Sequence, residues 1–168
     1  NAYCNNMDWT GATNNPVLVG DAGYQIQLQG SITLATNLIA DFTGDYSFSS
    51  TTINTINLQG VTLNGDAQLI GTGQWTLQND FNSNQNILFN EGTFNTNNFN
   101  LSIAGFISNS SLTRNIDLSN STIKTFGKSS ALPIGSFLLG TDSTWVINST
   151  NLTFNPGTST IEMNSTSN

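Results

Sequence analysis

Three Gly-Asp dipeptides place carboxylates at nearly even steps along the first half of the chain. They are Gly20-Asp21, Gly44-Asp45 and Gly65-Asp66, and consecutive copies are 24 and 21 residues apart. If the chain winds into coils of about that length, the three carboxylates stack on successive turns, where their oxygens suit Ca²⁺. Turn chemistry explains the same dipeptides, because Asp and Gly are both common in tight turns. We therefore expect no cofactor, with Ca²⁺ as the one candidate ion.

The other ionisable residues do not form a familiar catalytic arrangement. The chain has ten acidic residues, three basic residues and no histidine. Glycosidases place two carboxylates about 5 to 10 Å apart, and the only acidic pair close in sequence is Asp41 and Asp45. Arg114 has Asp117 as its nearest acidic neighbour in sequence, and neither a Gly-x-Ser-x-Gly turn nor a phosphate-binding loop is present. We expect no enzymatic activity and assign no catalytic residue.

Composition excludes several other kinds of site and partner. Cys4 is the sole cysteine, so the sequence lacks the ligands of structural zinc and any Cys-His nucleophile pair. Its thiol is either idle or half of a disulfide to a segment outside this sequence. The net charge of −7 disfavours nucleic acid. Because no apolar run approaches the roughly 20 residues that span a bilayer, we also expect no membrane insertion.

The three tryptophans could bind sugars or fill a core. An exposed aromatic face stacks on the apolar face of a pyranose, whereas Trp75 and Trp145 alternate with Leu77 and Ile147 as core residues do. We therefore predict that Trp75 and Trp145 are buried. Trp9 remains a candidate for stacking on a sugar ring.

The elements that must position these residues are short β-strands. Only 8% of the residues are charged, while Asn, Ser, Thr, Gln and Gly are abundant, which favours strands and tight turns over helices. Apolar and polar residues alternate with period two in bursts separated by turn residues. The bursts lie at 24–28, 32–34, 42–48, 56–58, 61–63, 75–77, 87–89, 99–103, 116–118, 145–147, 152–154 and 161–163.

A repeated phrase indicates how these strands are arranged. Phe89-Asn90-Glu91-Gly92-Thr93 returns as Phe154-Asn155-Pro156-Gly157-Thr158, and a looser copy is Leu118-Ser119-Asn120-Ser121-Thr122. Repeats of this kind are typical of stacked coils, none of which buries its inner face alone. A sandwich of antiparallel hairpins would show similar strands but no repeated phrase. The sequence therefore predicts an all-β fold, a parallel β-solenoid in the form of a right-handed β-helix of about five to seven coils.

The phrase also predicts a register. Five apolar residues are expected at equivalent positions, which gives steps of 24, 31, 29 and 36 residues: Leu34, Leu58, Phe89, Leu118 and Phe154. Stacked asparagines hydrogen-bond their copies, so four are expected to form one turn ladder: Asn64, Asn90, Asn120 and Asn155. We expect residues 1–22 to be a lead-in or capping segment and residues 23–168 to be β-helix repeats that continue beyond residue 168.

Several segments resemble the repeat regions of large secreted surface proteins of Bacteroidota. They are Gln74-Trp75-Thr76-Leu77, the run from Glu91 to Asn98, the run from Thr113 to Leu118, and Gly157-Thr158-Ser159-Thr160-Ile161, with Asp8-Trp9-Thr10-Gly11-Ala12 similar to the segment that often precedes them. The resemblance implies type IX secretion, and some such proteins are adhesins, including those of gliding motility. Asp142-Ser143-Thr144 resembles the O-glycosylation signal of these proteins, which implies Ser143 as the modified residue.

The sequence and the resemblance together give an expected function. It is a non-catalytic segment of a large secreted bacterial surface protein that acts as an adhesin stalk or ligand-presenting β-helix. The expected partners are surface glycans or other extracellular ligands, with the type IX secretion or gliding machinery as a further candidate. The alternative is the β-helix of a carbohydrate-binding or polysaccharide-degrading protein. An ice-binding face is disfavoured because the Thr pairs are unevenly spaced.

Overall fold

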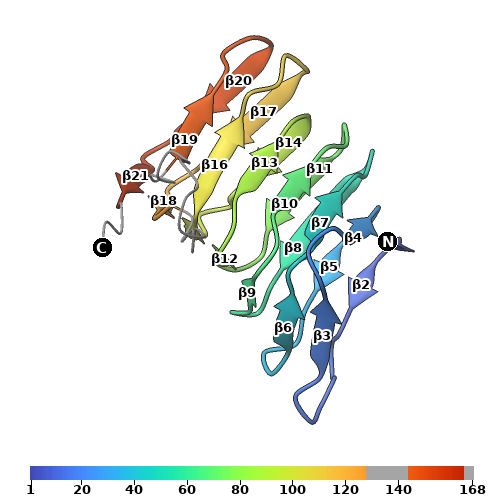
Figure 1. Ribbon diagram of the computed structural model, residues 1–168. Helices are drawn as coiled ribbons and strands as arrows, with labels where there is room; N and C mark the ends of the chain where they lie inside the picture. Colours follow the sequence, from blue (N-terminus) through green and yellow to red (C-terminus); the bar gives the residue numbers. More distant parts are fainter. Residues whose placement is uncertain (128–143, 165–168) are drawn as a thin grey trace, which may run out of the picture.

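Short parallel strands, joined by turns and loops, stack along one axis throughout the described chain (Figure 1). The computed structural model describes residues 1–127 and 144–164, and within these ranges it contains 21 strands and no helix. All strand pairs in these ranges are parallel. The prediction of an all-β parallel solenoid is confirmed, and the described residues make about six turns.

Each coil contributes one strand to each of three faces. Face A consists of β1 (Ala2–Cys4), β4 (Gln25–Leu28), β7 (Asp45–Phe48), β10 (Ala67–Leu69), β13 (Ile87–Phe89), β16 (Gly105–Ser108) and β19 (Thr144–Ile147). Face B consists of β2 (Met7–Asp8), β5 (Ile32–Thr33), β8 (Ile53–Asn57), β11 (Gln74–Leu77), β14 (Gly92–Asn95), β17 (Arg114–Asp117) and β20 (Leu152–Asn155).

The third face, face C, is divided into two sheets. One consists of β3 (Val17–Gly20) and β6 (Ile39–Phe42), and the other of β9 (Thr62–Leu63), β12 (Phe81–Ser83), β15 (Leu101–Ile103), β18 (Thr122–Thr125) and β21 (Thr160–Met163). Asn64 joins the two sheets, because its Nδ2 donates to the carbonyl oxygen of Ala40 at 2.6 Å. Residues 1–22 supply β1, β2 and β3, which pair with β4, β5 and β6.

Inward side chains form columns, because parallel pairing repeats the same register from one coil to the next. One column of face A runs Ile26, Tyr46, Ala67, Ile87, Phe106 and Trp145. One column of face B runs Trp75, Phe94, Ile116 and Phe154. Most of these side chains are fully buried, so the interior is a packed core. Outward positions alternate with them and are mainly polar.

The register expected from the repeated phrase is wrong. Phe89 ends β13 on face A, whereas Phe154 lies in β20 on face B and pairs with Ile116. Leu34 and Leu58 do follow paired strands, but the five expected residues do not form one column. The physical reason is that every coil turns three corners. Each corner needs the same turn residues, so the phrase recurs at different corners.

Coil lengths are accordingly shorter than expected. Neighbouring residues of the face A column are 19 to 24 residues apart from Ala2 to Phe106, and Phe106 and Trp145 are 39 apart. The longer step contains residues 128–143, which lie outside the described ranges.

The prediction of a single asparagine ladder is also wrong, because its four members are spread over three different corners. Asn64 follows β9, Asn90 follows β13, and Asn120 and Asn155 lie near the ends of β17 and β20. Amide pairs do form between coils, with other partners. Asn84 Nδ2 donates to Asn64 Oδ1 at 2.7 Å, and Asn120 Nδ2 donates to Asn98 Oδ1 at 2.9 Å. Asn155 Nδ2 donates to Asp117 Oδ1 at 3.3 Å.

Candidate functional site

The structure brings two of the three candidate calcium carboxylates into register. Asp45 and Asp66 precede the paired residues Tyr46 and Ala67, whereas Gln25, rather than Asp21, pairs with Asp45. Asp45 Oδ2 accepts a hydrogen bond from Gln68 Nε2 at 2.6 Å, and Asp66 Oδ1 accepts one from the backbone N of Asn86 at 2.9 Å. Within residues 1–127 and 144–164, no three His, Cys, Asp or Glu side chains gather closely enough to hold a metal ion.

Arg114 is a structural residue at the corner between faces A and B. Its side chain is buried, and its Nη1 donates to the carbonyl oxygen and Oγ of Ser108 at 2.7 and 2.6 Å. Its Nη2 donates to the carbonyl oxygens of Asn148 and Thr150, both at 2.7 Å. Its Nε donates to the carbonyl oxygen of Leu112 at 3.2 Å. Because desolvation disfavours the charged form, burial lowers the pKa of Arg114.

The other candidate acids do not gather around Arg114. Asp117 Oδ1 accepts hydrogen bonds from the N and Oγ of Ser119. Asp41 lies in β6 on face C, whereas Asp45 lies in β7 on face A. The acidic pair that is closest in sequence is therefore divided between two faces.

The tryptophans contribute to the core. Trp75 is fully buried and packs edge-on against Phe48, with ring centroids 5.0 Å apart. Trp145 is half-buried and stacks on Phe106 with centroids 4.7 Å apart. Trp9 is half-buried and packs against the core cluster. None of the three offers a fully exposed ring.

Cys4 is an inward residue of β1 that pairs with Leu28. Its thiol is free in the structure, and burial raises its pKa. Ser143, the residue expected to carry a sugar, lies outside the described residues.

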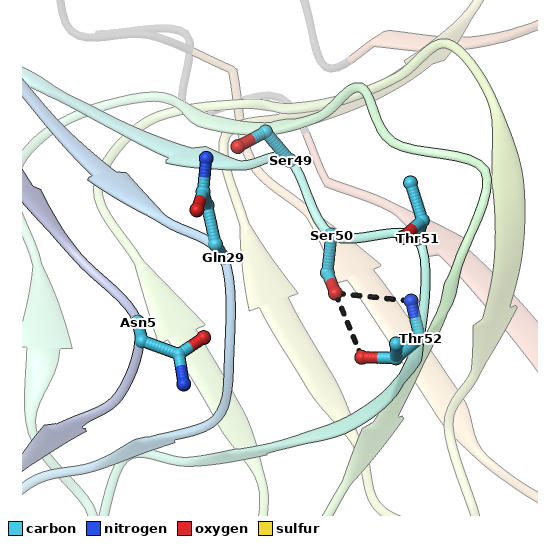
Figure 2. Close-up of a pocket in the computed structure, with 6 residues that line it drawn as sticks. All are labelled: Asn5, Gln29, Ser49, Ser50, Thr51 and Thr52. Carbon is cyan, nitrogen blue, oxygen red and sulfur yellow. Dashed lines mark hydrogen bonds between the residues drawn. The ribbon is translucent and has the colours of Figure 1, made fainter.

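A polar depression of about 280 Å³ opens at the corner between faces A and B (Figure 2). Asn5 and Gln29 line one side, and the segment from Ser49 to Thr52 lines the other. Ser50 Oγ lies 3.0 Å from Thr52 Oγ1 and accepts a hydrogen bond from the Thr52 backbone N at 3.1 Å. These hydroxyl groups therefore bond mainly to one another.

A larger groove, of about 420 Å³, runs over the outer surface of face C across β12, β15, β18 and β21. Four of its side chains form one column in register: Asn82, Ser102, Lys124 and Glu162. Lys124 Nζ lies 3.6 Å from a carboxylate oxygen of Glu162, and both side chains are partly exposed. Asp80, Asn100 and Thr122 border the groove beside this column.

Sequence reasoning did not single out this groove, although a signal was present. Thr122-Ile123-Lys124-Thr125 and Thr160-Ile161-Glu162-Met163 share the same alternation, with Ile inward and a charged residue outward. The two segments are 38 residues apart, a separation that none of the expected coil lengths matched.

Comparison with known protein families, curated proteins and solved structures finds no match to this chain. The described residues also contain no helix that could cross a membrane.

Proposed function

We propose that this chain is a non-catalytic segment of a large secreted bacterial surface protein, in which it acts as an adhesin stalk or a ligand-presenting β-helix. The observation that supports this most directly is the continuous stack of three-strand coils around a filled core. Such a stack gives length through nearest-neighbour contacts and presents outward side chains in regular columns. A stalk needs the first property and a ligand-presenting surface needs the second.

The surface location is supported by the resemblance of the repeats to Bacteroidota surface proteins. On this proposal the chain is exported by the type IX route, and the secretion or gliding machinery is a candidate partner in addition to extracellular glycans. The scarcity of exposed positive charge suits an extracellular polar surface. Among the described basic residues, Arg114 is buried and Lys124 is paired with Glu162.

The non-catalytic role is supported by the positions of Asp41 and Asp45, the one acidic pair that is close in sequence. Glycosidases bring two carboxylates together around one bond, and Asp41 and Asp45 lie on different faces. The alternative, a carbohydrate-binding or polysaccharide-degrading β-helix, is favoured by one observation, the polar groove on face C.

Two measurements test the proposal. Antibodies raised against the purified chain should label intact cells of the organism that encodes it, and should label them without permeabilisation. The purified chain should release no reducing ends from polysaccharides. Labelling that requires permeabilisation would contradict the surface role, and release of reducing ends would favour the degrading alternative.

A further inference from the structure

We propose that the groove on face C binds an extended, uncharged polysaccharide whose chain runs along the solenoid axis. This inference rests on the proposed function, because it names the ligand class and the site of a ligand-presenting surface. It is carried by the geometry, hydrogen bonding and charge of the groove.

The polar side chains of the groove are spaced regularly, as the units of a polymer are. Asn82, Ser102, Lys124 and Glu162 are successive residues of one outward column. Strands in a sheet are about 4.8 Å apart, so the column places a polar side chain at each of four positions over about 14 Å. Regularly spaced hydrogen-bonding groups along a line match a chain of repeating units better than one compact ligand.

The border of the groove is held in place by bonds between coils. Asp80 Oδ1 accepts a hydrogen bond from the backbone N of Asn100 at 2.8 Å, and Asn100 Oδ1 accepts one from the backbone N of Thr122 at 2.9 Å. Each side chain is thereby tied to the next coil. Fixed polar groups lose little conformational entropy when a ligand binds.

The central side chains remain available to a ligand. Within the described residues, the amide of Asn82 and the hydroxyl of Ser102 make no hydrogen bond to another protein group, although both are only partly exposed. An amide and a hydroxyl each donate and accept hydrogen bonds, as sugar hydroxyls do. In the depression of Figure 2, by contrast, the hydroxyl of Ser50 is already bonded to Thr52.

The charge of the groove selects an uncharged ligand. Lys124 is countered by Glu162 at 3.6 Å, and Asp80 adds a second carboxylate. With a net charge of −7 on the whole chain, an anionic polysaccharide would be repelled. Among the residues that the structure describes, no aromatic side chain lines the groove, so binding depends on hydrogen bonds.

Native electrophoresis in gels containing dissolved polysaccharide tests this inference. We expect retardation by at least one of three neutral polymers, a β-glucan, a mannan and a xylan, and none by alginate or chondroitin sulfate. Ser102→Trp fills the groove and should abolish the retardation. Thr76→Trp is the matched control, because Thr76 is an outward, partly exposed residue of β11 on face B, and it should be retarded like the unchanged chain.

A second variant keeps the test decisive if Ser102→Trp does not fold. Asn82→Ala removes one hydrogen-bonding group and should weaken binding about five- to tenfold. Retardation by anionic polymers only, an equal loss in Thr76→Trp, or no retardation in any neutral gel would overturn the inference. These results leave the surface role standing, since that role fails only if intact cells are not labelled.

Discussion

Arg114 and Thr150 are 36 residues apart in sequence, yet Arg114 Nη2 donates a hydrogen bond of 2.7 Å to the carbonyl oxygen of Thr150. The same guanidinium binds the carbonyl oxygen of Ser108 on its own coil. It therefore joins the corner loops of two successive coils, between which the chain includes residues 128–143. We infer that Arg114 fixes the position at which β19 and β20 join the stack.

Arg114→Met should lower the free energy of unfolding by about 2 to 4 kcal/mol, because it leaves several corner carbonyl groups without their donors. Lys124→Met is the matched control, since it removes an exposed cation whose pair with Glu162 contributes little, below about 1 kcal/mol. Urea unfolding followed by circular dichroism measures both changes. Equal unfolding midpoints for the two variants would contradict the role given to Arg114.

Phe94 and Phe154 provide a test of the face B column, because both belong to it but differ in burial. Phe94 is 0% exposed and Phe154 is 38% exposed. Phe94→Ala should cost about 3 to 5 kcal/mol of stability, as expected for a fully buried phenyl ring. Phe154→Ala should cost below about 2 kcal/mol. Thermal melts compare the stabilities of the two variants. A larger loss of stability in Phe154→Ala than in Phe94→Ala would contradict the face B column.

Tyr46 should limit stability at alkaline pH. Its hydroxyl is buried without a hydrogen-bond partner among the described residues, and desolvation raises its pKa well above the ordinary value of 10.0. The folded state therefore holds the phenol proton more tightly than the unfolded state does. The difference in proton affinity does not lower the free energy of unfolding below about pH 10. As the pH rises further, the unfolded state loses the phenol proton first, so the free energy of unfolding falls.

Tyr46→Phe should remove that loss, so its stability should decline less between pH 10 and pH 11.5 than that of the unchanged chain. At neutral pH the substitution should be neutral or stabilising by about 1 kcal/mol, since it deletes an unpaired polar group. Urea titrations at a series of pH values compare the two chains. Parallel declines would show that ionisation of Tyr46 is not responsible.

Gly65 permits the close approach of two coils. A Cβ at this position would overlap the carbonyl oxygen of Gly44, which belongs to the backbone of the preceding coil. Gly65→Ala should therefore destabilise the fold by about 2 kcal/mol or more, because backbone cannot move aside as a side chain can. Gly60→Asn is the control, since Gly60 has φ +81° with open space around it, and Asn tolerates that conformation. A melting temperature unchanged by Gly65→Ala would contradict the packing.

The sequence predicted the parallel stack because alternation and turn residues are local properties. Ile26 and Leu28, for example, lie inward in β4 as their spacing from Gln27 predicts. The expected strands leave out β1, β2 and β3 in residues 1–22, and also β10, β12, β14, β16 and β18. In β12, β16 and β18 a small polar residue lies at an inward position. Ser83, Ser108 and Thr125 are buried there, so the apolar alternation is interrupted.

The register and the groove could not be predicted from local patterns. Corners of faces A, B and C use the same turn residues, and nothing in the phrase distinguishes the corner after Phe89 from the corner after Phe154. The column that contains Lys124 and Glu162 depends on that register. Their opposite charges were visible in the sequence, but their proximity follows only once the coil boundaries are known.

The hydrogen bonds between coils lie parallel to the long axis of the stack, as the pairing of Ile26 with Tyr46 and of Tyr46 with Ala67 illustrates. Tension applied to the two chain ends would consequently load the outermost pair of coils first and peel them away one at a time. Each peeled coil of roughly 20 residues would lengthen the tether by about 70 Å. A rod built in this way lengthens in steps under tension, and it shortens again when its coils pair once more.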